Sequence, residues 1–295
     1  MFWKSRTISK IGLTPPAPFE TRAPLAICLI VKDEETHIGE WAKFHIRAGV
    51  DHIFVYDNGS SDKTVPIIRD ALGDKVTILP WDQKLCDGRS KAEIHNQVLA
   101  YAHCLRNFGA GYRWMAFIDV DEFLVPTAEA SIPDALAPLA DKAQISLPWH
   151  MFGRCGHEKP PAGGILANYT QRMKDPLSSE HALNWKCIVD PCKVTGVRVH
   201  GFDIENAPIT VNDVGLLAQL DDRKNKAFYS NAAIQLNHYY TRSNAELQAK
   251  VNRGSNKTVD SQKHLKRVMR IVDAIEKDTV TDTSVADFLA RRSAS

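Results

Sequence analysis

The sequence feature that most constrains the fold is the apolar run from Trp114 to Pro126, which is interrupted at its centre by Asp119, Asp121 and Glu122. A strand buried in a protein core does not carry three carboxylates unless other groups compensate their charge. We therefore expect the acids to lie where the strand leaves the sheet. Open α/β sheets bind their ligands at that carboxyl edge.

The spacing of the acids bears on what they bind. Asp119 and Asp121 are two residues apart, so on a strand they face the same side, whereas Glu122 points the other way. In that arrangement the two aspartates converge on one hard cation, which prefers oxygen ligands. An Asp-x-Asp pair is also typical of a helix cap or a solvated strand edge. The apolar residues on both sides of the pair favour a metal site.

Length and composition exclude several classes of protein. The 295 residues are sufficient for one large α/β domain or two small ones. With 37 basic and 35 acidic residues, no excess charge favours nucleic acid as a partner. The six cysteines form no Cys-x-x-Cys pair and no zinc-type spacing. Because we find no signal peptide and no apolar run long enough to span a bilayer, we expect a soluble, cytoplasmic protein.

Strand-like and helical patterns alternate along the first half of the chain. Strands are expected at 25–31, 51–56 and 76–80, and helices at 38–48, 64–72 and about 90–108. This alternation is typical of a parallel sheet covered by helices. Further strands are expected at 144–149, 185–189, 193–200 and 234–240, with a short helix at 132–139 and helices from residue 244 onwards. Residues 1–23, with three prolines, are expected to form an extended arm or a docking segment.

Several motifs follow one another in the order found in one enzyme family. They are Ile30–Glu34, Trp41, Gly49–His52, Tyr56–Asp62, Trp114–Phe123, Trp149–Gly153, Lys186–Ile188, His200 and Asn237–Ser243, then Lys250 and Arg253–Gly254. Together they resemble the family 2-like glycosyltransferases related to family 92. The resemblance implies an α/β protein of the GT-A type, with a Rossmann-like nucleotide-binding sheet flanked by helices, a mixed acceptor-side half and C-terminal helices. The expected divisions are an arm of residues 1–23, a glycosyltransferase domain of residues 24–254 and a helical segment of residues 255–295.

The resemblance also implies a metal site. In this family the Asp-x-Asp motif is expected to hold Mn²⁺ or Mg²⁺ against the diphosphate of a nucleotide sugar, here a UDP-sugar. A divalent cation stabilises the charge that develops on the departing diphosphate. Asp121 is the first expected ligand, and Asp119 is the second, acting directly or through water or the ribose. A later histidine, His238 or His200, is expected to complete the site, although a lone histidine on a strand is more often a hydrogen-bonded core residue.

Other residues are expected to bind the nucleotide. Asp57 matches the acid that contacts the base or ribose in this superfamily, but its position also fits a turn or a helix cap. Lys32, Asp33 and Glu34 follow the first strand and are expected at the rim of the same pocket. Asp33 stands where many relatives carry asparagine, which adds a negative charge there.

Positive charge for the diphosphate is expected from two places. Arg89, with Lys91, precedes an expected helix, and its alternative role is a solvated helix start. Lys250 and Arg253 lie three residues apart on a helix, where they form either a phosphate clamp or an ordinary basic surface.

An inverting displacement also needs a general base for the acceptor hydroxyl. The candidates are Asp203, Glu205 and His150, and the sequence does not choose between them. Trp149, together with Phe152 and Trp185, is expected to shape the acceptor site, because aromatic rings stack on sugar faces.

These features favour one of three function classes. The leading interpretation is a metal-dependent, inverting glycosyltransferase that uses a saccharide or lipid-linked acceptor in surface polysaccharide or glycoconjugate synthesis. The alternative is a non-catalytic nucleotide- or carbohydrate-binding module of the same fold, which has no need of the metal motif. The third is a peripheral protein at the inner face of the membrane, indicated by the basic amphipathic helix Lys263–Lys277, although such helices more often pack on their own domain.

Overall fold

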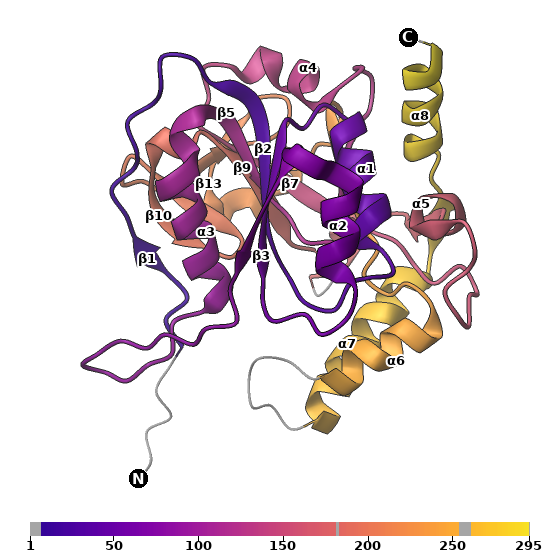
Figure 1. Cartoon of the computed structure of the whole chain (residues 1–295). Helices are drawn as coiled ribbons and strands as arrows, with labels where there is room; N and C mark the ends of the chain where they lie inside the picture. The colour runs from indigo at the N-terminus through magenta and orange to yellow at the C-terminus, as the bar shows by residue number, and fades with distance from the viewer. Residues whose placement is uncertain (1–6, 181–182, 254–260, 295) are drawn as a thin grey trace.

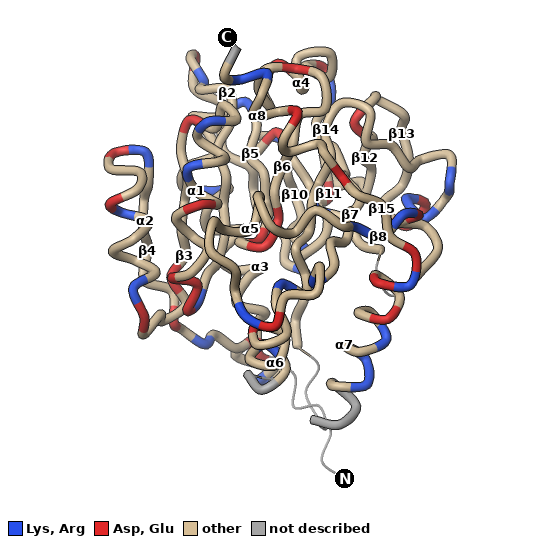
Figure 2. The backbone as a smooth tube through the Cα atoms, turned by 90° about the vertical axis from the view of Figure 1, so that its right-hand side faces the viewer, with Lys and Arg blue, Asp and Glu red and all other residues tan. Residues whose placement is uncertain are grey.

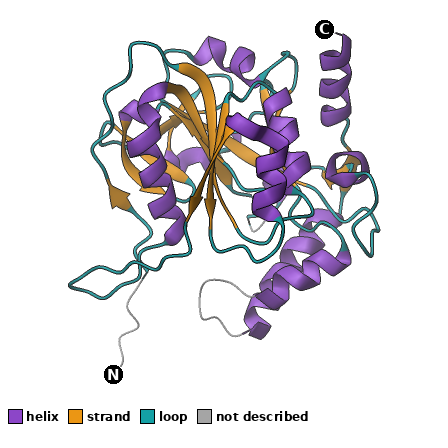
Figure 3. Ribbon diagram, in the orientation of Figure 1, coloured by secondary structure: helices purple, strands orange, loops and turns teal. Residues whose placement is uncertain are grey.

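The structure of the chain is a computed structural model that describes residues 7–180, 183–253 and 261–294. A large twisted sheet forms its centre, with helices on both faces (Figures 1 and 3). The main path of this sheet has the strand order β13-β12-β7-β9-β5-β2-β3-β4, and β14 pairs with both β7 and β6. The α/β class expected of a GT-A protein is therefore confirmed.

The strands of the central sheet carry the site. They are β2 (Ala23–Val31), β3 (His52–Asp57), β4 (Val76–Pro80), β5 (Tyr112–Phe117), β6 (Glu122–Pro126), β7 (Gln144–Met151), β9 (Trp185–Val189), β12 (Ile209–Val211), β13 (Leu217–Gln219) and β14 (Ile234–His238). β2 is parallel to both β3 and β5, and β3 is parallel to β4. The carboxyl ends of these four strands therefore lie at one edge, as the strand-helix alternation predicts. β9 then pairs antiparallel with β5 and β7, which begins the mixed half.

Two smaller sheets and the helices complete the fold. One small sheet contains β1 (Ile11–Gly12), β10 (Val194–Arg198) and β11 (Gly201–Ile204), and the other contains β8 (Gln171–Met173) and β15 (Thr279–Thr281). The helices are α1 (Ile38–Arg47), α2 (Thr64–Leu72), α3 (Asn96–Phe108), α4 (Ile132–Leu136), α5 (Gly164–Asn168), α6 (Asn244–Arg253), α7 (Ser261–Glu276) and α8 (Ser284–Ala294).

Two hydrophobic cores fill the space on either face of the sheet. On one face α1 and α2 pack through residues such as Trp41 and Ile68, and α8 joins this core where Phe288 meets Phe44 with ring centroids 5.5 Å apart. On the other face α3 packs through Tyr101 and neighbouring residues against the sheet and against β10 and β11. Because β2 is covered on both faces, its residues 25–29 are fully buried, which explains the continuous apolar run in the sequence.

Two predicted elements differ in the structure, and short strands such as β15 were not predicted. The run 114–126 is two strands, β5 and β6, separated by a turn that contains Asp119 and Asp121. The helix expected from residue 90 begins at Asn96, because residues 86–93 instead form a turn in which Ser90 N donates to Asp87 Oδ1 at 2.6 Å. The strand β15, only three residues long, had no pattern from which to predict it.

The ends of the described chain pack on the sheet. Residues 7–23 are mostly extended, β1 pairs antiparallel with β10, and Lys10 Nζ lies 2.7 Å from Asp203 Oδ2. Basic and acidic residues are both distributed along the whole chain, and α7 carries several basic residues (Figure 2). No helix within residues 7–180, 183–253 and 261–294 has the length and apolarity needed to cross a membrane.

Candidate active site

A cavity of about 560 Å³ lies at the carboxyl edge of the parallel strands. Its walls come from three segments: the connection from β2 to α1, the turn between β5 and β6, and the segment from β14 into α6. The lining residues are Ile30, Val31, Lys32, Asp33, Glu34, Thr36, His37, Asp119, Val120, Asp121, Tyr240, Thr241, Arg242, Glu246, Ala249 and Lys250. The sheet edge predicted to bind a ligand therefore carries a cavity, and both aspartates of the motif line it.

The turn between β5 and β6 contains both aspartates of the motif, and Glu122 follows as the first residue of β6. Glu122 N donates to Asp119 O at 3.1 Å, and Asp119 N donates to the Glu122 carboxylate at 2.8 Å. These two hydrogen bonds close a turn over residues 119–122, so the acidic side chains do not alternate as they would on a strand. As expected, Asp119 and Asp121 line one cavity and Glu122 does not, but Asp119 and Glu122 share the partner Lys186, which the alternation of side chains on a strand did not predict.

One group of charges, which we name the structural cluster, consists of Asp119, Glu122 and Lys186. Lys186 projects from β9, is 1% exposed, and its Nζ lies 2.6 Å from Asp119 Oδ2 and 3.5 Å from Glu122 Oε2. Gln97 of α3 donates to the other oxygen of Asp119 at 3.0 Å. Both oxygens of the Asp119 carboxylate therefore already have partners from the protein.

The pKa values of the structural cluster follow from its burial. Burial opposes the charge on Lys186, but Asp119 and Glu122 hold its pKa well above the ordinary value. Burial raises the pKa of Glu122 to about 8, even though Lys186 acts in the opposite direction. One ammonium lies beside the partly exposed Asp119 carboxylate and the fully buried Glu122 carboxyl group, so the cluster holds one close ion pair and a second, weakly acidic carboxyl group.

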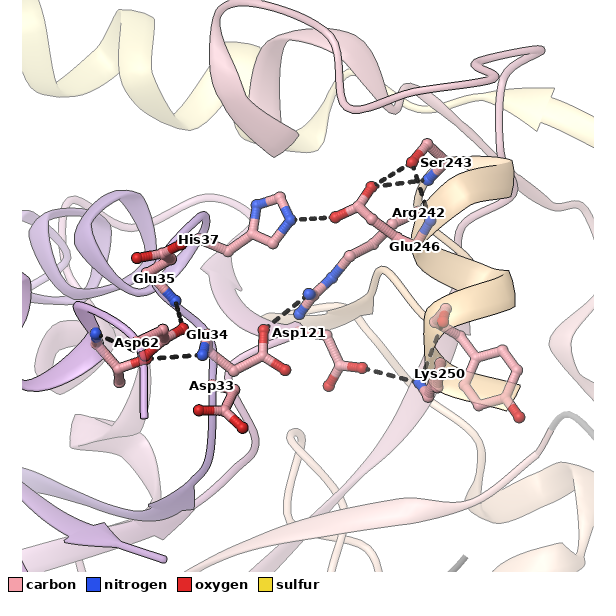
Figure 4. A network of polar contacts seen from close by, with 12 residues as sticks. Asp33, Glu34, Glu35, His37, Asp62, Asp121, Arg242, Ser243, Glu246 and Lys250 are labelled. Carbon is pink, nitrogen blue, oxygen red and sulfur yellow. Dashed lines mark hydrogen bonds and ion pairs between the residues drawn. The ribbon is translucent and has the colours of Figure 1, made fainter. Parts of the chain in front are cut away.

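A second group, which we name the cavity cluster, consists of Asp121, His238 and Lys250. Asp121 Oδ2 lies 3.4 Å from His238 Nε2. The same oxygen lies 3.3 Å from Lys250 Nζ (Figure 4). Lys250 also donates to Tyr240 O at 3.1 Å and lies 4.0 Å from the centre of the Tyr240 ring. Tyr239 N donates to Asp121 O at 2.8 Å, which anchors the turn to the segment after β14.

The cavity cluster contains an ionised carboxylate and a neutral imidazole. Burial opposes ionisation of Asp121, but Lys250 and His238 hold its pKa well below the ordinary value. Burial lowers the pKa of His238 despite the neighbouring Asp121 carboxylate. At neutral pH the cavity therefore presents a carboxylate oxygen beside an uncharged histidine.

Further ion pairs join α6 and the residues before it to the β2–α1 connection. Arg242 Nη1 lies 2.8 Å from Glu34 Oε2, and His37 Nε2 contacts the Glu246 carboxylate (Figure 4). Burial opposes the charge on Glu246, but hydrogen bonds from His37 and Ser243 lower its pKa to about 2. These contacts, like that of Lys250 with Asp121, connect two cavity walls that are far apart in the sequence.

Backbone strain is present on both of these walls. Asp33 has φ of 53° and Arg242 has φ of 50°, in the left-handed region that non-glycine residues seldom adopt. Such residues cost about 1–3 kcal/mol and cluster at ligand-binding sites. The Asp33 carboxylate accepts hydrogen bonds from the backbone and hydroxyl of Ser61, which hold it toward the α2 side of the cavity rim.

The donor atoms of the cavity cluster fit a divalent cation only in part. Asp121 offers carboxylate oxygen and His238 offers imidazole nitrogen, both of which bind Mn²⁺ or Mg²⁺. The part of the chain that the structure describes contains no group of three or more His, Cys, Asp or Glu side chains placed to hold a metal. A cation held here would take its remaining ligands from water or from substrate phosphates, which is the usual way that proteins bind Mg²⁺.

The predicted nucleotide-binding residues divide between the cavity and other places. Lys32, Asp33, Glu34, Asp119 and Lys250 line the cavity. Two others have positions typical of their alternative roles: Asp57 Oδ1 accepts from Ser60 N at 3.0 Å as in a turn, and Arg89 is exposed in the loop before α3. Arg253 ends α6, and its side chain lies outside the described part of the structure.

The three general-base candidates do not line the cavity. His150 is fully buried in β7, its Nε2 lies 2.6 Å from Tyr229 Oη, and burial lowers its pKa to about 3. Asp203 lies between Lys10 and Arg198, and exposed Glu205 pairs with Lys193 at 3.4 Å. His200, predicted as a metal ligand, has its Nδ1 3.1 Å from Trp185 O. Burial lowers the pKa of His200 to about 4.

Sequence reasoning missed four residues of the site: His37, Lys186, Arg242 and Glu246. Lys186 carried a signal, because a lone lysine within the apolar strand Trp185–Val189 requires a buried acidic partner. Arg242 lies within the motif Asn237–Ser243 and could have been singled out there. His37 and Glu246 are 209 residues apart, and nothing local connects them.

Comparisons with known proteins identify the family of the chain. A sequence model of glycosyltransferase family 92 matches residues 23–272. A family 92 protein of Ricinus communis is 29% identical over 220 residues, which is 70% of this chain and 37% of that protein. One from Oryza sativa subsp. japonica is 28% identical over 159 residues, or 52% of this chain and 25% of that protein. Galactan β-1,4-galactosyltransferase GALS2 of Arabidopsis thaliana is 28% identical over 116 residues, or 37% of this chain and 21% of that protein. The chain thus spans 37% or less of the length of these relatives.

Solved structures show only distant likeness. Glucosyl-3-phosphoglycerate synthase of Mycobacterium tuberculosis, crystallised with Mn²⁺, uridine diphosphate and phosphoglyceric acid, is 21% identical with a TM-score of 0.28, over 45% of this chain and 44% of that chain. A mycobacterial protein is 17% identical with a TM-score of 0.34, over 85% of this chain and 75% of that chain. The sequence match over residues 23–272 decides the assignment: the chain belongs to glycosyltransferase family 92.

Proposed function

We propose that the protein is a divalent-metal-dependent glycosyltransferase that moves a sugar from a UDP-sugar to a saccharide or lipid-linked acceptor, with inversion at the anomeric carbon. The observation that carries the proposal is the ionised Asp121 at the wall of the cavity, paired with His238 and with Lys250. Membership of family 92 supports the reaction class. Synthesis of a surface polysaccharide or glycoconjugate, in the cytoplasm, is part of the same proposal.

The charge of the cavity supports a requirement for metal. Its charged lining residues comprise five carboxylates, Asp33, Glu34, Asp119, Asp121 and Glu246, and three cations, Lys32, Arg242 and Lys250. Summed over these Asp, Glu, Lys and Arg side chains, the lining has a formal charge of −2, which would repel a diphosphate. A divalent cation cancels this charge and adds a direct attraction for the phosphate oxygens.

The residues of the chain have distinct roles in the proposed reaction. Asp121 and His238 would hold the cation, which supplies Lewis-acid stabilisation of the departing diphosphate when bound. Lys250 and Arg242, each held by one carboxylate in the structure, would turn to phosphate oxygens as the donor enters. The acceptor hydroxyl attacks the anomeric carbon from the face opposite the phosphate, which inverts the configuration.

Calorimetry with uridine diphosphate (UDP) and guanosine diphosphate (GDP) tests the proposal. Each nucleotide is titrated into the wild type and into Asp121→Asn, with and without Mn²⁺. Asp74→Asn is the matched control, because Asp74 is exposed on the short turn after α2. We expect UDP to bind only with Mn²⁺, and the affinity to fall by about tenfold or more in Asp121→Asn but not in the control.

Two results would count against the proposal. Binding of UDP that is equally tight without metal would remove the metal requirement. The absence of binding by either nucleotide in the wild type, with and without Mn²⁺, would favour a carbohydrate-binding module that keeps the fold without turnover.

A further inference from the structure

A group of aromatic side chains lies beside the cavity. It consists of Trp149 of β7, Trp185 of β9, His238 of β14 and His200, and we name it the aromatic cluster. The Trp149 ring lies 4.3 Å from the His238 ring and 5.7 Å from the His200 ring between centroids. His238 also contacts Asp121 of the cavity cluster, so the two groups share one residue and lie side by side.

The aromatic cluster contains polar atoms that are buried without partners. Trp149 Nε1, Trp185 Nε1 and His238 Nδ1 make no hydrogen bond with any described residue. A buried donor without a partner costs about 1–3 kcal/mol, so such atoms are rare unless a ligand or water satisfies them. Two indole N–H groups beside the half-buried rings of Trp149 and His200 suit a sugar, which presents hydroxyls to donors and C–H faces to aromatic rings. Trp149 and His200 are only half-buried, so a ligand can reach the cluster.

The hydrogen bond of His200 determines which ring nitrogen carries its proton. A carbonyl oxygen only accepts hydrogen bonds, so Nδ1, 3.1 Å from Trp185 O, carries the hydrogen. In the neutral ring Nε2 then has a free lone pair. Arg223 Nη1 donates to His200 O at 2.9 Å, which fixes the backbone that carries the ring.

The position of His200 relative to the cavity follows from its partner. Trp185 is followed directly in β9 by Lys186, whose ammonium lies 2.6 Å from Asp119 at the cavity wall. His200 therefore lies against the residue that precedes Lys186, and its ring takes part in none of the described ion pairs of the structural and cavity clusters.

We infer that the aromatic cluster is the acceptor subsite for a neutral saccharide, and that His200 Nε2 takes the proton of the attacking hydroxyl. This inference rests on the proposed function. In the step, a bond forms between the hydroxyl oxygen and the anomeric carbon, and the bond from that carbon to the phosphate oxygen breaks. The bonding electron pair leaves with the nucleoside diphosphate, and the hydroxyl proton moves to Nε2 to give an imidazolium.

Two substitutions at His200 test its role. The amide of Asn reaches the position of Nδ1, so His200→Asn can keep the bond to Trp185 O while it removes Nε2. The amide of Gln reaches the position of Nε2, so His200→Gln can bind a hydroxyl but cannot take its proton. His52→Asn is the control, because His52 bonds Thr77 on the far strands β3 and β4.

The readouts are UDP affinity in the presence of Mn²⁺ and release of UDP from UDP-galactose and UDP-glucose with galacto- and gluco-oligosaccharides. We expect both His200 variants to bind UDP within about twofold of the wild type and to lose roughly 10²–10⁴-fold in kcat, which is the usual effect of removing a general base. His200→Gln should keep the KM for the oligosaccharide. A kcat within about threefold of the wild type, or a parallel loss of UDP affinity, would overturn the role of His200.

Saturation-transfer NMR with the same oligosaccharides tests the subsite separately, without donor or metal. We expect saturation transfer to the oligosaccharide in the wild type and its loss in Trp149→Ala. Transfer that persists in Trp149→Ala, or that is absent from the wild type, would overturn the subsite. Failure of UDP to bind would instead overturn the donor site, so the two failures are distinguishable.

Discussion

Asp119 and Asp121 are separated by one residue in the same turn, yet they belong to opposite kinds of environment. In the structural cluster, Asp119 is held by Lys186 at 2.6 Å and by Gln97 at 3.0 Å. In the cavity cluster, Asp121 has only the longer contacts to His238 and Lys250, at 3.4 and 3.3 Å. Both acids line the cavity, but the Asp119 carboxylate has close partners on both of its oxygens, whereas the two contacts of Asp121 fall on one oxygen and are longer.

The difference lies in the two lysines. The Lys186 side chain is 1% exposed and fixed within β9, so its charge must stay beside Asp119 and Glu122. The Lys250 side chain, on α6, is 37% exposed and can move to a new partner at little cost. An Asp-x-Asp spacing therefore does not by itself identify a metal ligand; the mobility of the nearby cation distinguishes the two acids.

The largest expected effect is on the free energy of unfolding and follows removal of the Lys186 ammonium. Lys186→Met removes the ammonium that lies beside the partly exposed Asp119 and the fully buried Glu122, and we expect the free energy of unfolding to fall by about 3–5 kcal/mol. Urea denaturation followed by circular dichroism measures it. Adding Asp119→Asn and Glu122→Gln to the same chain should restore most of the loss. A loss below about 1 kcal/mol, or no restoration, would show that the structural cluster does not stabilise the fold.

Loss of the Lys250 ammonium should weaken nucleotide binding more than it lowers the free energy of unfolding. Lys250→Met is expected to weaken UDP binding in the presence of Mn²⁺ by about tenfold, which is about 1.4 kcal/mol, because one phosphate contact is removed. Its free energy of unfolding should change by less than about 1 kcal/mol, as is typical of a partly exposed ion pair. Calorimetry and urea denaturation on one preparation compare the two effects. A large stability loss with unchanged UDP affinity would make Lys250 structural.

The smallest effect concerns the pH dependence of stability. Because the pKa of Glu122 is raised to about 8 in the fold, its contribution is fully present below its ordinary pKa of 4.5 and is lost as the pH rises through 8. We therefore expect Glu122→Gln to reduce the decrease in Tm between pH 5 and pH 8. Glu129→Gln, at an exposed position, is the control. An unchanged slope in Glu122→Gln would mean that Glu122 is ionised throughout this range.

The sequence predicted the framework of the site better than its contacts. Apolar runs of strand length, separated by amphipathic helices, were sufficient to predict the parallel strands β2, β3 and β4, and the acids of Trp114–Pro126 correctly marked the carboxyl end of β5. The partners of the two aspartates were not predictable from the sequence. Asp119 pairs with Lys186, 67 residues away, and Asp121 pairs with Lys250, 129 residues away. Local pattern carries no information on pairings of that range.

The different roles of Asp119 and Asp121 can be tested by measuring Mn²⁺ affinity with electron paramagnetic resonance in the presence of UDP. The variants Asp121→Asn and Asp119→Asn are compared at equal protein concentration. We predict that Asp121→Asn weakens Mn²⁺ binding by at least about tenfold, as expected for loss of a direct ligand, and that Asp119→Asn changes it by less than about threefold. Equal losses of Mn²⁺ affinity in both variants, or a larger loss in Asp119→Asn, would contradict the assignment of Asp121 as the metal ligand and of Asp119 as a structural residue.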